Sequence, residues 1–169
     1  LALVFVFQAF PTVSQRYVDD FISDLPVHED SPYLKAFQPG FDAFVAHPIL
    51  GIGPGNYASE CYLSQGEDLT AKCQPHPHNF FIQLSGETGV IGLLAGTTMI
   101  ISIIWSAFAK SREPYADLFD KIAFVIPLAL FWPIASTADF FGQMNNIFLW
   151  SAVAISLCSG AHKQKTLNY

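Results

Sequence analysis

The feature that most constrains this chain is a run of 22 residues, Thr88 to Ala109, that contains no charged side chain. A helix of that length rises about 33 Å, which is enough to cross a hydrocarbon core of roughly 30 Å. Soluble proteins seldom bury a helix that is so long and so uniformly apolar. The run therefore predicts a transmembrane helix, which we place at residues 79–109.

The remaining apolar segments favour more than one crossing. The opening LALVFVFQAF lacks an initiator Met, a basic segment and a cleavage site, so we interpret residues 1–14 as the end of a transmembrane helix and not as a signal peptide. Residues 122–160 are apolar but interrupted by Pro127, Pro133 and Asp139, which favours two transmembrane helices joined by a short outer turn. The predicted fold class is all-α: a fragment of a polytopic α-helical membrane protein.

Lysine and arginine indicate the side of the membrane, because cytoplasmic loops retain positive charge during insertion. Segment 110–121 carries three of these residues and the tail 161–169 carries two, so both are predicted to be cytoplasmic. Loop 15–78 carries three basic against nine acidic residues, and we place it on the opposite side, periplasmic or extracellular. Such an acidic balance does not suit nucleic acid.

The large extracytoplasmic loop is long enough to have structure of its own. Its stretch YLKAFQPGFDAF, residues 33–44, has aromatic residues near helical spacing and predicts one or two short amphipathic helices at the membrane surface. The stretch HPILGIGPGNY, residues 47–57, permits close backbone approach, so the N–H groups of Gly53 and Gly55 are candidates to hold an anion. A tight turn explains the same residues.

Two cysteines of the outer loop, Cys61 and Cys73, would lie in an oxidising compartment, where a disulfide persists. Two free thiols are the alternative, and Cys158 is interpreted as a packing residue. A metal site that adds His76 and His78 is a further hypothesis, but the spacing C-x2-H-x-H is not a standard zinc pattern. We therefore predict no metal site and no cofactor.

The pair His76 and His78 stands where the outer loop enters the long helix, with Asn79 suited to cap it. A histidine there can be neutral near pH 7 and take a proton from a hydroxyl group, although a cap or surface role is the simpler interpretation. Glu87 is a candidate second acid–base group or an interfacial residue.

Small and polar residues further along suggest structural roles. Gly89, Gly92 and Gly96 lie near one stripe, which predicts that another helix packs closely there. Asp139 and the nearby Gln143, Asn145 and Asn146 either face an outer cavity or form a satisfied turn between helices.

The order of these motifs resembles the O-antigen ligase and polymerase family. His78-Asn79, nine residues and then Gly89-x-x-Gly92 match the family motif H-N-x9-G-x-x-G, and HPILGIGPGNY matches a glycine-rich stretch that precedes it. The phrase FFGQMNNIFLW, residues 140–150, is similar to the family's closing helix. The resemblance extends over roughly residues 33–160.

This resemblance implies a metal-independent glycosyltransferase of the bacterial inner membrane that acts in lipopolysaccharide biosynthesis. Such an enzyme transfers a glycan from undecaprenyl diphosphate to an acceptor hydroxyl, on the lipid A core in a ligase, at the periplasmic face. His78 would be the catalytic base or would orient the acceptor. The residues that would bind substrate are Arg16, Lys35, His76, Asn79, Glu87, Gly53 and Gly55.

The sequence departs from the family pattern at one position. Members commonly carry an arginine about 15 residues before the proline of the glycine-rich stretch, where this chain has Tyr33. Arg16 or Lys35 would have to supply that cation, or an arginine upstream of Leu1 would.

Several alternatives stay open at this stage. A polysaccharide polymerase and a protein O-oligosaccharyltransferase share the fold, and their acceptors would be a second glycan or a protein. A transporter subunit and a non-catalytic membrane protein belong to other classes. If the protein were a transporter, we would expect ionisable residues in mid-membrane. The sequence has none in residues 88–109 or in residues 122–138.

Overall fold

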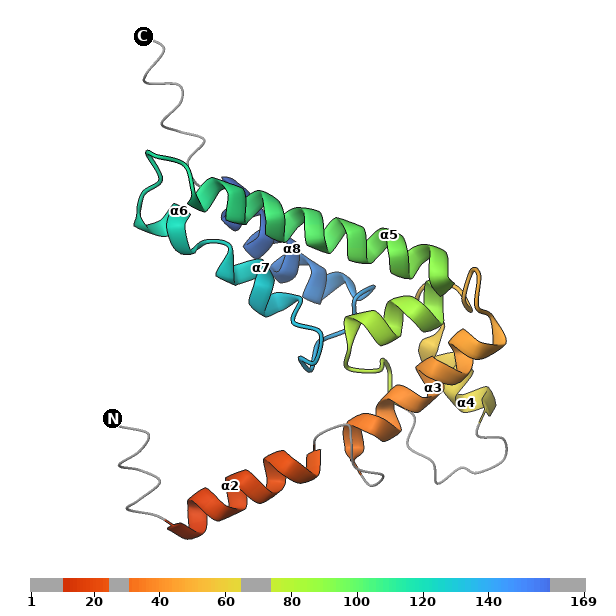
Figure 1. Ribbon diagram of the computed structural model, residues 1–169. Coiled ribbons are helices and arrows are strands. Elements are labelled where there is room, and N and C mark those ends of the chain that lie inside the picture. Colours follow the sequence, from red (N-terminus) through yellow and green to blue (C-terminus); the bar gives the residue numbers. More distant parts are fainter. Residues whose placement is uncertain (1–10, 25–30, 65–73, 159–169) are drawn as a thin grey trace.

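The computed structural model describes residues 11–24, 31–64 and 74–158, and within those ranges all regular structure is helical (Figure 1). The helices are α2 (Pro11–Asp24), α3 (Pro32–Ala46), α4 (Tyr57–Ser64), α5 (Phe80–Ser111), α6 (Leu118–Ile122), α7 (Val125–Leu130) and α8 (Gln143–Cys158). The all-α prediction is confirmed for these ranges. Most of the predicted transmembrane end at 1–14 and the whole tail 161–169 lie outside the described residues.

Short helices occupy the segment predicted to be a periplasmic loop. The amphipathic stretch 33–44 lies within α3, which is a single helix despite Pro39 and begins at the side-chain cap of Ser31. α3 packs tightly on α5 because glycines face each other: a Cβ added at Gly86 would lie 2.8 Å from the carbonyl oxygen of Gly40. The helical content is as predicted, whereas the periplasmic location stays a prediction.

α5 is the described helix that is long and apolar enough to cross a membrane. The side-chain oxygen of Asn79 accepts the N–H groups of Phe81 and Ile82, which satisfies donors left free at a helix start. The predicted cap is therefore confirmed. Lys110 in the last turn places positive charge at the other end, as favoured by the helix dipole.

α5 is broken at one residue. Gly89 has φ 64° and ψ −165°, and it divides α5 into a short piece, residues 80–88, and a long piece, residues 90–111. The short piece folds back along the long one (Figure 1). A side-chain carbon of Leu84 accordingly lies 2.8 Å from the position that a Cβ of Gly96 would occupy. In a straight helix, residues 84 and 96 would be about 18 Å apart. The long piece still rises about 33 Å, the length of a membrane crossing.

The break changes which segments contact the predicted stripe of Gly89, Gly92 and Gly96: a loop lies at Gly89, and the short helical piece of α5 lies at Gly96. A Cβ at Gly89 would lie 2.4 Å from the backbone of Ile49, which belongs to a loop. Gly96 is covered by Leu84 from the same helix. The stripe was predicted for a straight helix, and the fold-back brings other residues of the same helix to it.

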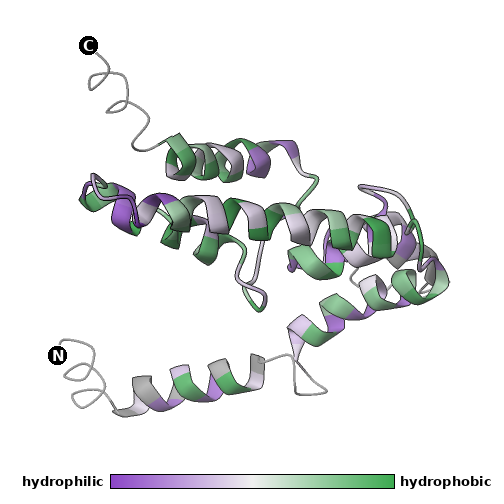
Figure 2. Cartoon of the chain, turned by 45° about the horizontal axis from the view of Figure 1, so that its top comes forward, coloured by the Kyte–Doolittle hydropathy of each residue, from purple (hydrophilic) through white to green (hydrophobic). Residues whose placement is uncertain are grey.

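The polar side chains of the long piece are satisfied within the helix. Thr98, Ser102 and Ser106 are exposed, and each hydroxyl donates to the carbonyl four residues earlier at 2.7 Å. A hydrocarbon environment offers no water to hydroxyl groups, so these internal bonds suit a transmembrane segment. Figure 2 shows hydrophobic colouring along much of this helix and hydrophilic colouring in the loop that follows it.

An apolar core joins α5 to α7 and α8. Its buried members are Phe80, Ile100, Phe131, Leu149 and Val153. Phe80 contacts the rings of Phe131 and Phe140 at centroid distances of 5.8 and 5.2 Å, in the tilted and edge-on geometries that aromatic pairs favour. Because Phe80 starts the short piece and Ile100 lies in the long piece, the same core stabilises the fold-back.

The C-terminal part returns along α5. α6 starts with a capping box formed by Asp117 and Asp120, and α7 is short and contains Pro127. Residues 131–142 turn beside the start of α5 and lead into α8. That two transmembrane helices lie within 122–160 stays a prediction.

We expect Gly89→Ala to lower the stability of the purified protein by at least about 2 kcal/mol, because the substitution adds a left-handed strain and a collision with Ile49. Thermal unfolding in detergent measures this. The matched control is Gly55→Ala, which has φ 79° but no atom within 4 Å of its Cβ position, so it should cost about 1–2 kcal/mol. Equal losses of stability in the two variants would contradict the close contact between Gly89 and the backbone of Ile49.

Candidate functional site

The histidine junction, residues 76–79, lies at the end of the bundle where α5 begins, against the turn between α7 and α8. Two hydrogen bonds fasten it there. The N–H of Thr137 donates to the carbonyl of His78 at 2.8 Å, and the side-chain amide of Asn79 donates to the carbonyl of Pro133 at 2.7 Å. Segments more than 50 positions apart in sequence thus form one site.

The two histidines are close neighbours. Their ring centroids are 4.3 Å apart and the ring planes are inclined at 55°. His78 has φ 55°, the one positive φ outside glycine among the described residues. A left-handed conformation costs about 1–2 kcal/mol for such a residue and persists where neighbouring contacts enforce it. The bonds at Thr137 and Asn79 supply that constraint.

His76 is held in its neutral form. Burial, followed by the nearby His78, lowers the pKa of His76 below its ordinary value of 6.5, while Asp139 and a hydrogen bond to the backbone of Thr137 act in the opposite direction. Its Nε2 atom is buried and has no hydrogen-bond partner in the part of the chain that the structure describes. The ring therefore has one unprotonated nitrogen at neutral pH.

Polar side chains at every fourth position form a buried ladder on one face of the short piece of α5. They are Asn79, Gln83 and Glu87, which are 5, 2 and 1% exposed. The Gln83 amide donates to Asp139 Oδ1 at 2.7 Å and its carbonyl oxygen accepts the N–H of Phe140 at 2.8 Å. Sequence reasoning missed Gln83, although its spacing from Asn79 and Glu87 in an apolar segment was a visible signal.

Glu87 holds the glycine-rich stretch. Its carboxylate accepts the N–H of Gly55 at 2.8 Å and the N–H of Tyr57 at 2.9 Å, and its backbone carbonyl accepts the N–H of Gly53 at 2.9 Å. Hydrogen bonds to a charged acceptor are the stronger kind. The anion that the N–H group of Gly55 contacts in the structure is therefore Glu87 itself.

The glycine-rich stretch is inserted into the break of α5. Four backbone bonds join them: Ile52 to Gly86, Gly53 to Glu87, Val90 to Pro48 and Ile91 to Ile49, at 3.1, 2.9, 2.8 and 3.5 Å from donor to acceptor. A helix break exposes carbonyls before it and N–H groups after it, and this loop satisfies both. Gly51 has to be glycine here, because a Cβ would lie 2.3 Å from the backbone of Glu87.

Tyr57 ties this region to α3. It is 2% exposed, and its hydroxyl donates to the carbonyl of Ala36. Burial, and then the negative charges of Glu87 and Asp42, raise the pKa of Tyr57 far above its ordinary value. The phenol stays protonated and serves as a structural donor.

The two predicted diphosphate cations are placed differently. Lys35 lies in the first turn of α3 and is exposed. Arg16 belongs to α2, and both views show α2 apart from the bundle of α5, α7 and α8 (Figures 1 and 2). The side chain of Arg16 lies outside the described part of the structure, so its predicted role as a cation stays a prediction.

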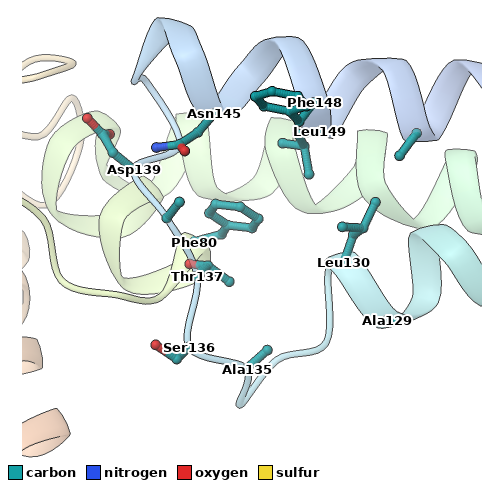
Figure 3. A pocket seen from close by; sticks show the side chains of 12 residues that line it. Phe80, Ala129, Leu130, Ala135, Ser136, Thr137, Asp139, Asn145, Phe148 and Leu149 are labelled. Carbon is teal, nitrogen blue, oxygen red and sulfur yellow. The ribbon is translucent and has the colours of Figure 1, made fainter.

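A pocket of about 450 Å³ opens beside the junction. Its walls come from the start of α5, the end of α7, the turn and α8; they include Phe80, Leu130, Thr137, Asp139, Asn145 and Phe148. Figure 3 shows Asp139 and Asn145 at one end and Leu130 toward the other. Asp139 accepts the N–H of Phe141 within the turn and also lines this pocket; that the pocket opens to the outer side stays a prediction.

The cysteine predictions fall largely on residues that the structure does not describe. Cys73 falls in the undescribed residues, so neither the disulfide with Cys61 nor the metal hypothesis that uses both is addressed. Within the described ranges, no group of three metal-ligating side chains occurs. Cys158 is an exposed free thiol at the end of α8 within the described residues, which corrects its predicted packing role.

Glu87→Ala should destabilise the protein by about 3 kcal/mol, because the buried N–H of Tyr57 and the partly buried N–H of Gly55 both lose their acceptor. Glu87→Gln keeps one acceptor oxygen and should lose less. The control, Glu113→Ala, removes an exposed carboxylate from the loop after α5. Thermal unfolding of the three variants tests the ladder, and a Glu87→Ala protein as stable as the control would refute it.

The lowered pKa of His76 gives a pH dependence. The folded state binds this proton more weakly than the unfolded chain, so the stabilising effect is complete above pH 6.5 and is lost as the pH falls through the folded pKa. Unfolding midpoints at pH 7.5 and 5.5 should therefore differ more in the natural protein than in His76→Asn. An identical difference in both proteins would exclude His76 as the source.

Comparison with known families identifies the chain. The model of the family described as O-antigen ligase (Wzy_C) matches residues 1–97, which include the glycine-rich stretch, the histidine junction and the break at Gly89. The match does not reach residues 140–150, so their similarity to a closing helix stays a prediction. Comparison with curated proteins gives no match, and comparison with solved structures gives none. The match spans more than half of the sequence, and the chain belongs to the O-antigen ligase family.

Proposed function

We propose that this protein is a glycosyltransferase of the O-antigen ligase type, which transfers a glycan from undecaprenyl diphosphate to an acceptor hydroxyl of the lipid A core. The observation that carries the proposal is the family match over residues 1–97. The proposed location is the inner membrane, with the transfer at its periplasmic face. The apolar length of α5 supports a membrane location, and the distribution of basic residues in the sequence supports the periplasmic face.

The reaction requires positioning of the two substrates more than activation of the leaving group. The acceptor oxygen attacks the anomeric carbon, the bond from that carbon to the diphosphate oxygen breaks, and the diphosphate leaves with the electron pair. The acceptor hydroxyl loses its proton during this exchange. The enzyme must align both substrates, offset the charge on the diphosphate and receive the proton. We propose that no metal is required, because the diphosphate is already a good leaving group.

We assign the role of proton acceptor, or of orienting the acceptor hydroxyl, to His78. Its backbone is fixed by the bond from Thr137 and by the Asn79 cap that follows it. Its partner His76 stays uncharged at neutral pH, which avoids electrostatic repulsion when His78 becomes protonated. These features support a histidine that gains and releases a proton without moving.

The diphosphate needs a cation, and we propose Lys35 or Arg16 for this role. The surrounding loop is acidic and repels an anionic substrate, so a basic side chain is needed there to offset the charge of the diphosphate. Gly53 and Gly55 already donate to Glu87. We therefore propose that these three residues bind substrate indirectly, by shaping the loop beside the junction.

We expect His78→Ala and His78→Gln to reduce glycan transfer by about 10²- to 10⁴-fold, the usual contribution of a general base. The matched control is His47→Ala, which removes an exposed histidine at the end of α3 and should transfer normally. Transfer is measured by complementation and with purified full-length protein in liposomes. Full transfer by both His78 variants at normal protein levels would defeat the assignment.

The same liposomes identify the acceptor. Lipid A core, a second repeat unit and a pilin-like protein are supplied in turn with the lipid-linked donor. Glycosylation of lipid A core alone supports the ligase, whereas labelling of the repeat unit or the protein indicates a polymerase or a protein O-oligosaccharyltransferase. No transfer to any of them, with folded protein, would favour a transporter subunit or a non-catalytic role.

A further inference from the structure

Asp139 is a carboxylate beside the histidine junction to which the proposed transfer gives no role. It lies in the turn between α7 and α8. Its Oδ1 atom accepts two hydrogen bonds, from the side-chain amide of Gln83 at 2.7 Å and from the N–H of Phe141 at 2.9 Å. Its Oδ2 atom accepts none from the described residues. One oxygen therefore fixes the carboxylate, and the other is available to a further donor.

The carboxylate belongs to the wall of the pocket beside the junction. That pocket has a volume of about 450 Å³, within the range of roughly 300–1,000 Å³ that small-molecule sites have. Gly142 leaves space next to the available oxygen, since a Cβ added there would lie 3.1 Å from Oδ2. Asp139 is thus anchored by one oxygen at a site large enough for a ligand.

Asn145 gives the pocket a second polar side chain at the same end (Figure 3). It is exposed, and its amide makes no hydrogen bond to the part of the chain that the structure describes. An amide both donates and accepts, whereas a carboxylate only accepts. The two side chains therefore suit neighbouring hydroxyl groups, each of which can donate and accept.

The rest of the lining is largely apolar and includes Phe80, Leu130 and Phe148. A sugar ring carries hydroxyl groups at its edge and C–H groups on its faces, so it needs both kinds of wall. A hydrocarbon chain in its place would leave the polar groups of Asp139 and Asn145 unpaired, which is unfavourable. A diphosphate would be repelled by the carboxylate. The lining therefore favours an uncharged sugar ring.

The pocket is joined directly to the histidine pair. Thr137, which lines it, donates its N–H to the carbonyl of His78 at 2.8 Å, and Phe80 follows His78 by two positions. Asp139 also acts electrostatically on His76, so the carboxylate and the histidine pair are within interaction range. A sugar held in the pocket thus has its hydroxyl groups beside the residue to which we assign the proton.

We propose that Asp139 and Asn145 bind a sugar ring of the acceptor glycan, with Gln83 as the positioning residue of Asp139. Oδ2 of Asp139 accepts a hydrogen bond from one hydroxyl, and the amide of Asn145 binds a neighbouring one. The diphosphate of the donor lies on another side of His78, away from the carboxylate. This inference rests on the proposed function, because it names the substrate that occupies the pocket. Sugars of the lipid A core and of a repeat unit share this chemistry, and separate probes distinguish them.

The first measurement is binding in the absence of donor. Full-length protein in nanodiscs is titrated into fluorescently labelled oligosaccharide of the lipid A core or of the repeat unit, both without lipid, and Kd is read from fluorescence polarisation. Asp139→Asn keeps an oxygen for Gln83 and Phe141 but removes the charge and the second acceptor. Asn145→Ala removes an exposed amide, and the matched control Glu113→Gln neutralises an exposed carboxylate after α5. Thermal unfolding verifies the fold of each variant.

We expect Asp139→Asn to raise the Kd of the oligosaccharide at least tenfold, because a hydrogen bond to a charged group is lost. Asn145→Ala should raise it at least threefold, and Glu113→Gln should leave it unchanged. The same Kd in the natural protein and in both pocket variants would overturn the proposal. Failure of the folded natural protein to bind either oligosaccharide would overturn it equally.

The second measurement is transfer in liposomes, with the donor and acceptor concentrations varied separately. In Asp139→Asn, KM for the acceptor should rise at least tenfold while KM for the donor changes less than twofold. A raised donor KM with an unchanged acceptor KM would place the donor in the pocket and contradict the inference. Selective binding without any transfer refutes only the proposed function, whereas transfer with unaltered Kd and acceptor KM refutes only the role of the pocket.

Discussion

The whole arrangement depends on the exchange of backbone hydrogen bonds at Gly89. A continuous helix over residues 80–111 would be a rod of about 48 Å, with its polar ladder far from any partner. At Gly89 the chain leaves the helical conformation, and the glycine-rich stretch supplies the bonding groups that the break removes. The fold-back follows, because the short piece can then pack on the long one through Leu84 and Phe80.

This fold-back assembles a site from three distant parts of the chain. The ladder on the short piece of α5 faces two ways: Glu87 binds the glycine-rich stretch, and Gln83 and Asn79 bind the turn before α8. The histidine pair lies at the end of that ladder. A buried network with most of its members satisfied is rigid, and rigidity is what a residue in the left-handed conformation of His78 requires.

The sequence predicted the parts whose signals are local. The apolar run, the Asn79 cap and the helices of the outer segment follow from hydropathy, capping chemistry and periodicity. The fold-back of α5 could not be predicted from the sequence, because a single glycine with positive φ in an apolar run leaves no periodic pattern. The partner of Glu87 was equally hidden: Gly55 and Tyr57 lie about 30 positions away, and only tertiary structure brings them to the carboxylate.

Whether α5 folds back at Gly89 is tested most directly by thiol crosslinking within the full-length protein. Cysteines replace Leu84 and Gly96 in a background without the native cysteines, and a crosslinker too short to bridge about 18 Å is added to membranes. The folded-back helix gives an intramolecular crosslink between the two positions, identified by mass spectrometry of the digested protein. A straight helix gives two singly modified cysteines and no crosslink, and that result would contradict the arrangement of the site.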